Sequence, residues 1–255
     1  MLTLKNFNYH EPVVHSDMQW PCPDGFHVPL SSEWEAVKTV WTTLGGSRYN
    51  WTNFGIALKL PFAGNRKQSS ADVGYQGSIW YYWSSTYYNI HNANILYFDS
   101  DNIQPNAIWG LSFADSIRCF KDSPVTPTSS WTKLYWTSIE AGWIFWDSDD
   151  WLISLSSNWT DWITIQDKNL WATQVWNSWD TLSEANCGKY FQRWNNYWFP
   201  FTWTLTDTST TQVDANWYWP WNYYNSSTFI KYNWTWDSSS NANLRWWVTQ
   251  WTWTD

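Results

Sequence analysis

Cysteine and histidine are the residue types in this chain best suited to redox chemistry or metal binding, and both are few. The three cysteines, Cys22, Cys119 and Cys187, allow one disulfide and leave one thiol over. The four histidines lack the spacing of a metal site; they are His10, His15, His27 and His91. The chain also shows no nucleophile–base arrangement, no glycine-rich phosphate loop and no paired-carboxylate motif. We therefore expect a protein that is not an enzyme.

Two acidic stretches could supply oxygen ligands to a calcium ion. They are Asp147-Ser148-Asp149-Asp150 and Asp99-Ser100-Asp101-Asn102. Neither has the regular alternation of acidic residues or the distal bidentate glutamate of an EF-hand loop. A solvated acidic turn is favoured over a calcium site at both places, so we expect no metal and no cofactor, with calcium as the alternative.

A dense aromatic stretch could stack on sugar rings. It contains Tyr81, Tyr82, Trp83, Tyr87 and Tyr88. In a strand, alternate side chains point to opposite faces, so some of these rings must fill the core, and we expect this of Trp83. Tyr81, Tyr87 and Tyr88 are the candidate ligand-binding residues.

The elements that must position these residues are one helix and several short strands. Ser32-Glu33-Trp34-Glu35 resembles a capping box, and Trp34, Val37, Val40 and Leu44 follow at helical spacing, which predicts about three helical turns. The strand candidates are 79–86, 95–98, 116–120, 152–155 and 162–165. Residues 123–130 form a Pro/Ser/Thr linker between residues 1–122 and 131–255. Long polar loops are expected after about residue 200.

Charge and hydropathy exclude two classes of partner. The chain has 14 Lys and Arg against 22 Asp and Glu, a net charge of −8, which argues against nucleic-acid binding because that needs a basic stripe. It has no run of 18 apolar residues, so no membrane span is expected. Its first residues lack the apolar core of a signal peptide, so a signal for export is expected outside this sequence. Low charge with much Ser, Thr, Asn and Tyr is typical of extracellular bacterial β-rich modules.

Tryptophan and glycine are present in unusual proportions. The chain has 29 Trp and 10 Gly, whereas Gly usually makes up about 7% of residues. Residues 1–130 hold 7 Trp and 8 Gly, but residues 131–255 hold 22 Trp and 2 Gly. Most of these Trp neither alternate along a strand nor recur on one helix face, so packing of a core does not account for them.

Many of the tryptophans stand where a turn calls for glycine. Trp51, Trp159, Trp217 and Trp234 follow Asn, Trp151 follows Asp150, and Trp179 follows Ser178. Asn-Gly, Asp-Gly and Ser-Gly are turn dipeptides because glycine accepts a positive φ without a Cβ clash. Some bacteria decode UGA as glycine, and translation with a table that assigns UGA to tryptophan would write Trp at each such codon. A truly Trp-rich protein is the alternative.

The energy of backbone strain favours the codon hypothesis. A bulky residue in a positive-φ site costs about 1–3 kcal/mol, and some twenty such sites would exceed the roughly 5–15 kcal/mol that stabilises a domain. Trp171 is a further position at which we expect UGA. Trp34, Trp83, Trp162 and Trp236 have neighbours that suit a large ring and are expected to be native, whereas Trp146 fits either residue.

The first part of the chain resembles the second half of the Fibrobacter succinogenes major paralogous domain, a family of bacterial extracellular modules. The resemblance is carried by four blocks in order: Cys22-Pro23-Asp24-Gly25-Phe26-His27-Val28-Pro29 with Glu33-Trp34, Ala57-Leu58-Lys59-Leu60-Pro61-Phe62-Ala63-Gly64-Asn65-Arg66, Tyr81-Tyr82-Trp83-Ser84-Ser85-Thr86, and Ile117-Arg118-Cys119. The family has glycine at the position of Trp80, in agreement with the codon hypothesis. In the first block, a structural His27 is favoured over a metal ligand.

The second part resembles the opening half of the same family. Trp162-Ile163-Thr164-Ile165-Gln166-Asp167-Lys168-Asn169-Leu170-Trp171-Ala172-Thr173 is similar to its first block, and Tyr190-Phe191-Gln192-Arg193-Trp194-Asn195-Asn196 to its aromatic-glutamine block. Arg193 departs from the Trp common at that place, which weakens the second match. The resemblance covers most of residues 20–122 and about 150–250. It implies the end of one repeat, a linker, and the start of a second repeat that is cut short at Asp255.

The resemblance implies a C-type-lectin-like α+β fold with small antiparallel sheets, one or two helices and long loops. It implies a structural role for the family-motif residues Pro23, Gly25, His27, Pro29, Trp34, Leu60, Pro61, Gly64, Arg66, Trp83, Ser84, Ser85, Arg118, Trp162, Asn169 and Leu170. It also implies a disulfide between Cys22 and Cys119, with two buried free thiols as the alternative. The two half-repeats could dock on each other as a circular permutant or stay apart.

The function implied is that of a non-enzymatic module, extracellular or at the cell surface, among other repeats of a longer protein. Its partner would be a glycan or surface polymer, by analogy of fold. The alternatives are a structural spacer without a ligand and a formylglycine-generating type of oxidase. Those oxidases share the lectin-like architecture but use a reactive cysteine pair late in the domain, and Cys22 and Cys119 match a structural bridge better.

Overall fold

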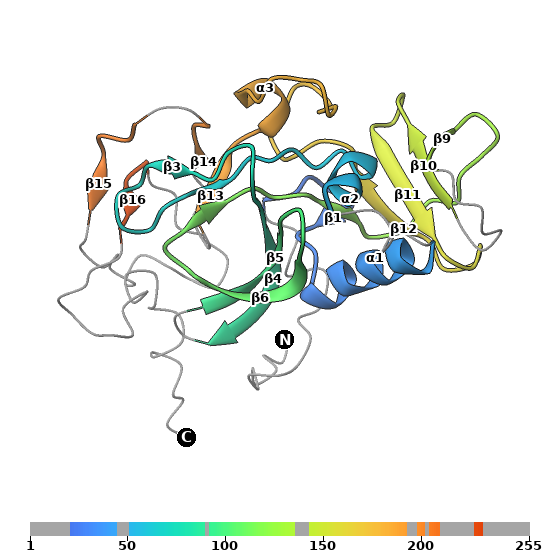
Figure 1. The fold of residues 1–255 in the computed structure, drawn as a ribbon, viewed down its shortest axis with the longest axis horizontal. Helices are drawn as coiled ribbons and strands as arrows, with labels where there is room; N and C mark the ends of the chain where they lie inside the picture. Colours follow the sequence, from blue (N-terminus) through green and yellow to red (C-terminus); the bar gives the residue numbers. More distant parts are fainter. Residues whose placement is uncertain are drawn as a thin grey trace, which may run out of the picture.

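The computed structural model of the chain describes residues 21–44, 51–89, 92–135, 143–192, 198–201, 204–209 and 227–231. Short antiparallel sheets dominate these segments, with a few helices, as expected for an α+β protein (Figure 1). The strands formed by residues 132–135, 143–147, 152–156 and 163–166 lie at one end of the molecule, and those formed by 208–209 and 229–230 lie at the other (Figure 1). The strands formed by 80–89, 92–98 and 103–110 lie between them.

The predicted helix is α1, Ser31–Thr43. It buries the face formed by Trp34, Val37, Val40 and Trp41. The predicted capping box is displaced, because the N-cap is Leu30 and its backbone N–H donates to the Glu33 carboxylate at 2.7 Å. Ser32 therefore lies inside the helix.

Three strands carry the aromatic stretch in a sheet of their own. They are β4 (Trp80–Asn89), β5 (Asn92–Phe98) and β6 (Ile103–Gly110), paired in that order. β5 contains the predicted strand 95–98, and β4 contains residues 80–86 of the predicted strand 79–86; both strands run on beyond the predicted residues, β5 at its start and β4 at its end. The acidic stretch 99–102 forms the turn between β5 and β6.

The largest sheet joins both parts of the chain. Its strands run in the order β1-β8-β12-β11-β10-β9, where β1 (Phe26–His27) and β8 (Phe120–Lys121) precede the linker and the other four follow it. These four are β9 (Thr132–Tyr135), β10 (Trp143–Asp147), β11 (Leu152–Ser156) and β12 (Ile163–Gln166). Ile165 of β12 pairs with Phe120 of β8, so the two segments are docked rather than apart.

A second shared sheet lies beside the first. Its order is β14-β13-β7-β2-β3, where β13 and β14 come from the second segment. Its strands are β2 (Asn65–Arg66), β3 (Val73–Gly74), β7 (Ala114–Asp115), β13 (Tyr190–Gln192) and β14 (Trp198–Phe199). A separate parallel pair is formed by β15 (Thr208–Ser209) and β16 (Phe229–Ile230).

The expected strand 116–120 is wrong over most of its length, because only Phe120 falls in a strand. The backbone there bonds to three different segments instead. Trp83 N–H donates to the carbonyl of Ser116, Leu170 N–H to that of Ile117, and Gln166 N–H to that of Cys119. The segment is thus extended but belongs to no single ladder.

Two short helices were not predicted. They are α2 (Trp51–Ala57), which contains Gly55, and α3 (Glu184–Cys187). The largest core cluster lies between α1, the β4–β6 sheet and the six-stranded sheet, and includes Trp34, Tyr82, Phe120, Ile153 and Ile165. Residues from both sides of the linker therefore share one core.

The linker 123–130 contacts the six-stranded sheet through Val125. Val125 N–H donates to the Thr164 hydroxyl at 2.7 Å, and its carbonyl accepts from the Ser154 hydroxyl at 2.9 Å. The linker is thereby fixed along β11 and β12.

Candidate functional site

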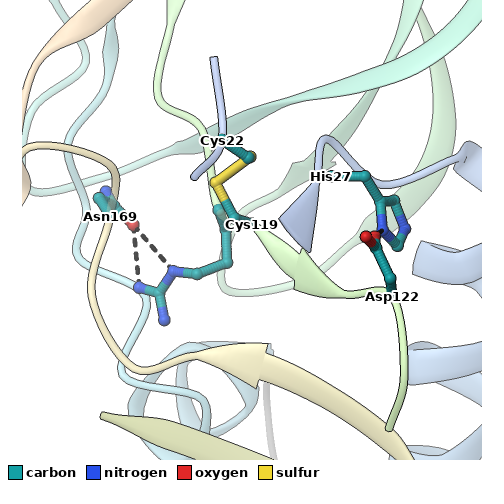
Figure 2. Close-up of a disulfide and its surroundings, with 6 residues drawn as sticks. Cys22, His27, Cys119, Asp122 and Asn169 are labelled. Atoms are coloured by element: carbon teal, nitrogen blue, oxygen red, sulfur yellow. Dashed lines mark hydrogen bonds and ion pairs between the residues drawn. A yellow bond between two sulfur atoms is a disulfide. The ribbon is translucent and has the colours of Figure 1, made fainter. Parts of the chain in front are cut away.

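The two cysteines named by the family resemblance form a disulfide. The Cα atoms of Cys22 and Cys119 are 5.8 Å apart, and the bond joins residues 97 positions apart in the sequence. Figure 2 shows the bridge with Asn169 on one side and with His27 and Asp122 on the other. Both cysteines are buried. Cys187 is the free, buried cysteine, and burial raises the pKa of its thiol to about 12, so the reactive thiolate is suppressed.

His27 bridges two carboxylates beside the disulfide. Its Nδ1 lies 2.7 Å from Asp122 Oδ1 and its Nε2 lies 3.0 Å from Glu33 Oε2. Burial alone lowers the pKa of His27, but the hydrogen bonds and charges of Glu33 and then of Asp122 outweigh it, so the pKa is raised. The geometry is that of a histidine satisfied by structural partners.

Arg118 and Asn169 form the polar junction between the segments. The Arg118 guanidinium donates to Asn169 Oδ1 at 3.2 and 2.9 Å, and Asn169 donates to the carbonyl of Cys187 at 3.0 Å. The guanidinium also donates to the carbonyls of Leu58, Lys59 and Gln166. Burial lowers the pKa of Arg118. A buried cation with so many acceptors holds these loops together and is not open to a ligand.

Most of the remaining family-motif residues also lie in the interior. Arg66 donates to the carbonyls of Pro200 and Ala71. The Trp83 indole N–H donates to the carbonyl of Phe191 at 2.6 Å, as expected of a core residue. Gly64 has a φ of +67°, and a Cβ there would lie 2.1 Å from the carbonyl oxygen of Gly74. The other buried members are Pro29, Trp34, Leu60, Pro61 and Ser84, whereas Ser85, Trp162 and Leu170 are half-buried and Pro23 and Gly25 are exposed.

The three candidate tyrosines lie in very different surroundings. Tyr81 is 4% exposed and packs on Tyr97 and Trp109, so its ring is not available for stacking on a ligand. Tyr81 does not fit the predicted ligand-binding role, because both faces of β4 are covered at this point. Tyr82 packs in one core cluster and Tyr81 in another. Tyr87 is half-buried and Tyr88 is 48% exposed.

The end of β4 also carries polar side chains next to the exposed ring. Asn92 at the start of β5 donates its amide to Asn89 Oδ1 at 3.1 Å, and Asn89 directly follows Tyr88. An exposed aromatic ring beside side-chain amides offers both stacking and hydrogen bonding to a ligand.

Both acidic stretches are hairpin turns. Asp99 Oδ1 accepts from the backbone N–H groups of Asp101 and Asn102 at 2.8 Å. Asp147 Oδ1 accepts from those of Asp149 and Asp150 at 3.0 and 3.3 Å. Their carboxylates thus cap turns. Within the described segments, no group of three or more His, Cys, Asp or Glu could hold a metal ion.

Among the described residues, three tryptophans have a positive φ, a conformation that glycine adopts without strain. Trp151 has φ 60°, Trp159 66° and Trp171 65°. Trp151 follows Asp150 and ends the turn between β10 and β11. Trp159 follows Asn158 and lies in the turn between β11 and β12. All three are at least 46% exposed, so burial of the indole does not offset the strain.

Other tryptophans do not follow this prediction. Trp51 begins the helix α2 and packs on Phe54, and Trp179 is 82% exposed with no positive φ. Trp80 is fully buried and its indole donates to the carbonyl of Leu60 at 2.8 Å. Its ring centroid is only 3.6 Å from that of Phe62, closer than the usual range of about 4.5–7 Å. The site of Trp80 is therefore filled but crowded.

The tryptophans expected to be native have packed surroundings where the structure describes them. Trp34 is fully buried, and Trp162 lies against Phe145 just before β12. Trp146 donates its indole N–H to Asp167 at 2.8 Å. Trp217, Trp234 and Trp236 lie outside the described residues, as do His10, His15, His91 and residues 193–197.

Residues from both sides of the linker line a pocket that was not predicted from the sequence. It has a volume of about 190 Å³ and is lined by Asn53, Ile56, Ala57, Lys59, Asn177, Ser178 and Trp179. Lys59 is 8% exposed and its Nζ donates to Asn177 Oδ1 at 3.1 Å. The pocket could not be found from sequence, since its lining residues are more than a hundred positions apart.

No helix in the described ranges is long and apolar enough to cross a bilayer. Comparison with protein-family models, with curated proteins and with solved structures gave no match to the chain. The family resemblance accordingly rests on the sequence blocks alone.

Proposed function

We propose that this chain is a non-enzymatic module, extracellular or at the cell surface, that binds a glycan or surface polymer through the tyrosine-bearing end of β4. The exposed ring of Tyr88 carries the proposal. It is anchored by a strand whose earlier residues are buried in two core clusters. A rigid strand presents the ring at little conformational cost.

The disulfide supports the extracellular location. Disulfides persist in secreted and surface proteins and are rare in the bacterial cytosol. The same bond argues against an oxidase that works through a cysteine pair, because Cys22 and Cys119 are both bonded and buried.

A structural spacer is the second candidate. The two shared sheets favour it, since the pairing of β8 with β12 joins the segments on either side of the linker in one sheet. A spacer needs such a connection but no exposed ligand site.

Glycan binding is tested by removing the exposed ring. We expect the purified, oxidised protein to bind a glycan or surface polymer on an array, and Tyr88→Ala to weaken this at least tenfold, as expected for a contact of about 1.4 kcal/mol. Tyr75→Ala is the matched control, because Tyr75 is 49% exposed but precedes the other end of β4. Binding by neither protein would favour the spacer, and equal binding by the parent and Tyr88→Ala would contradict a glycan site at Tyr88.

A further inference from the structure

Lys59 is a buried cation at the wall of a pocket between the two segments. Its backbone φ is 52°, in the left-handed region, where non-glycine residues are uncommon. Its side chain is held against the Trp146 ring, with Nζ 4.3 Å from the ring centroid. Burial of a charged lysine lowers the stability of the fold unless an opposite charge lies nearby, so an anionic partner would be favourable at this position.

The partners of Lys59 within the described residues match its charge only in part. Nζ has three donors and gives one to the neutral amide of Asn177. Burial lowers the pKa of Lys59 most, the charges of Asp167 and Asp180 raise it, and the charge of Arg118 lowers it. No carboxylate of the described segments forms an ion pair with Lys59 by direct contact.

Asn177 is itself fixed in place. Its backbone N–H and its side-chain amide both donate to Asp180 Oδ2, at 2.8 and 3.1 Å. Asp180 therefore orients Asn177, whose carbonyl oxygen in turn orients Lys59. The result is a preorganised set of polar groups on the pocket wall.

The remaining lining residues add short polar side chains. Asn53 and Ser178 line the pocket, and Ser178 is exposed at its rim. The volume of about 190 Å³ is below the about 300–1,000 Å³ of pockets for drug-sized ligands, so only a small ligand group fits. The ring of Trp179 also lines the pocket. Glycine, which the sequence predicts at 179, would make the pocket wider but leave its polar lining unchanged.

We infer that this pocket binds the carboxylate of an acidic sugar such as a hexuronate, with Lys59 as the cation and Asn177, Asn53 and Ser178 as polar contacts to the sugar. Ammonium and amide groups are the donors that recognise a carboxylate. The inference rests on the proposed binding of glycans, and adds a second site and the chemical class of one sugar.

Titration calorimetry with free glucuronate and glucose tests the inference. We expect the parent protein to bind glucuronate at least tenfold more tightly than glucose, and Lys59→Gln to abolish this preference. Lys38→Gln on α1 is the control and should behave like the parent. Absence of glucuronate binding by the parent protein, or an unchanged preference in Lys59→Gln, would overturn the inference.

A second pair of variants protects the test against misfolding of Lys59→Gln. Ser178→Glu places a negative charge at the exposed rim and should weaken glucuronate binding, whereas Ser178→Gln of similar size should not. Equal glucuronate binding by both Ser178 variants counts against the pocket. An array signal that depends on Tyr88 but only for neutral sugars would leave the proposed function standing and reject this inference.

Discussion

His27 links the first strand, the first helix and the end of the disulfide-bonded segment. It contacts Glu33 near the start of α1 and Asp122 just after β8. Both ring nitrogens are thus used by carboxylates, and the protonated ring can donate to both. The histidine stabilises the fold most when it carries a charge.

This arrangement predicts a stability that depends on pH. Since the pKa of His27 is raised in the folded protein, its contribution is fully present below the ordinary pKa of about 6.5 and is lost as pH rises through the folded-state pKa. We expect the free energy of unfolding to fall as the pH rises above the ordinary histidine pKa of about 6.5. Chemical denaturation across this range measures it.

His27→Gln serves as the comparison. It should lower stability by about 1–3 kcal/mol, because Glu33 and Asp122 lose their hydrogen bonds to the buried imidazole, and it should flatten the pH dependence. A pH dependence as steep as that of the parent protein would show that another group is responsible.

At the scale of elements, the disulfide fixes the edge of the six-stranded sheet. It joins the segment before β1 to the segment before β8, and these two strands pair with each other. The bond also adjoins Arg118, which carries the polar contacts to the second segment. Closing a loop of this length restricts the unfolded chain.

We expect removal of the disulfide to lower stability substantially. The separation of 97 residues corresponds to about 4–5 kcal/mol in the chain-entropy account. Denaturant unfolding of the Cys22→Ala/Cys119→Ala double variant should show this loss. A Cys187→Ala variant keeps the bridge and should lose as much stability on reduction as the parent. An unfolding midpoint in the double variant equal to that of the parent would contradict the structural role of the bridge.

The elements that could be predicted from the sequence are those whose apolar residues recur at regular spacing. Helix α1 and the strands β4, β5, β11 and β12 were predicted because their apolar residues recur with a clear period. Helix α2 was missed because a glycine interrupts it and its first residue was assigned to a turn. The extended segment 116–120 was predicted as a strand, since alternation alone does not tell whether the N–H groups that donate to its carbonyls come from one partner strand or from separate segments.

The candidate site was predictable only in part. Arg118 and Asn169 were both predicted as structural residues because they lie in blocks that resemble one family, and the structure places them in contact. The Lys59 pocket has no local signal and depends on docking of the two segments. Tyr81 and Tyr88 have the same residue type and lie in one strand, and their different burial follows from what covers each part of β4.

At the scale of the whole molecule, the distribution of tryptophan is the property that most needs an explanation. Residues 131–255 contain 22 Trp but only 2 Gly, although this part of the chain forms hairpin turns. Two of those turns place Trp151 and Trp159 at positive φ, and the loop after β12 does so with Trp171. Glycine meets this requirement without strain. Trp51, Trp80 and Trp179 also stand where glycine is predicted, but their φ is not positive. A positive φ therefore does not identify every predicted glycine position.

Tandem mass spectrometry of the protein from its natural source tests the central claim most directly. Peptides that cover residues 147–175 should contain glycine at 151, 159 and 171, while Trp34, Trp83 and Trp162 should be found as tryptophan and serve as internal controls. Tryptophan at 151, 159 and 171 in the folded natural protein would contradict the account.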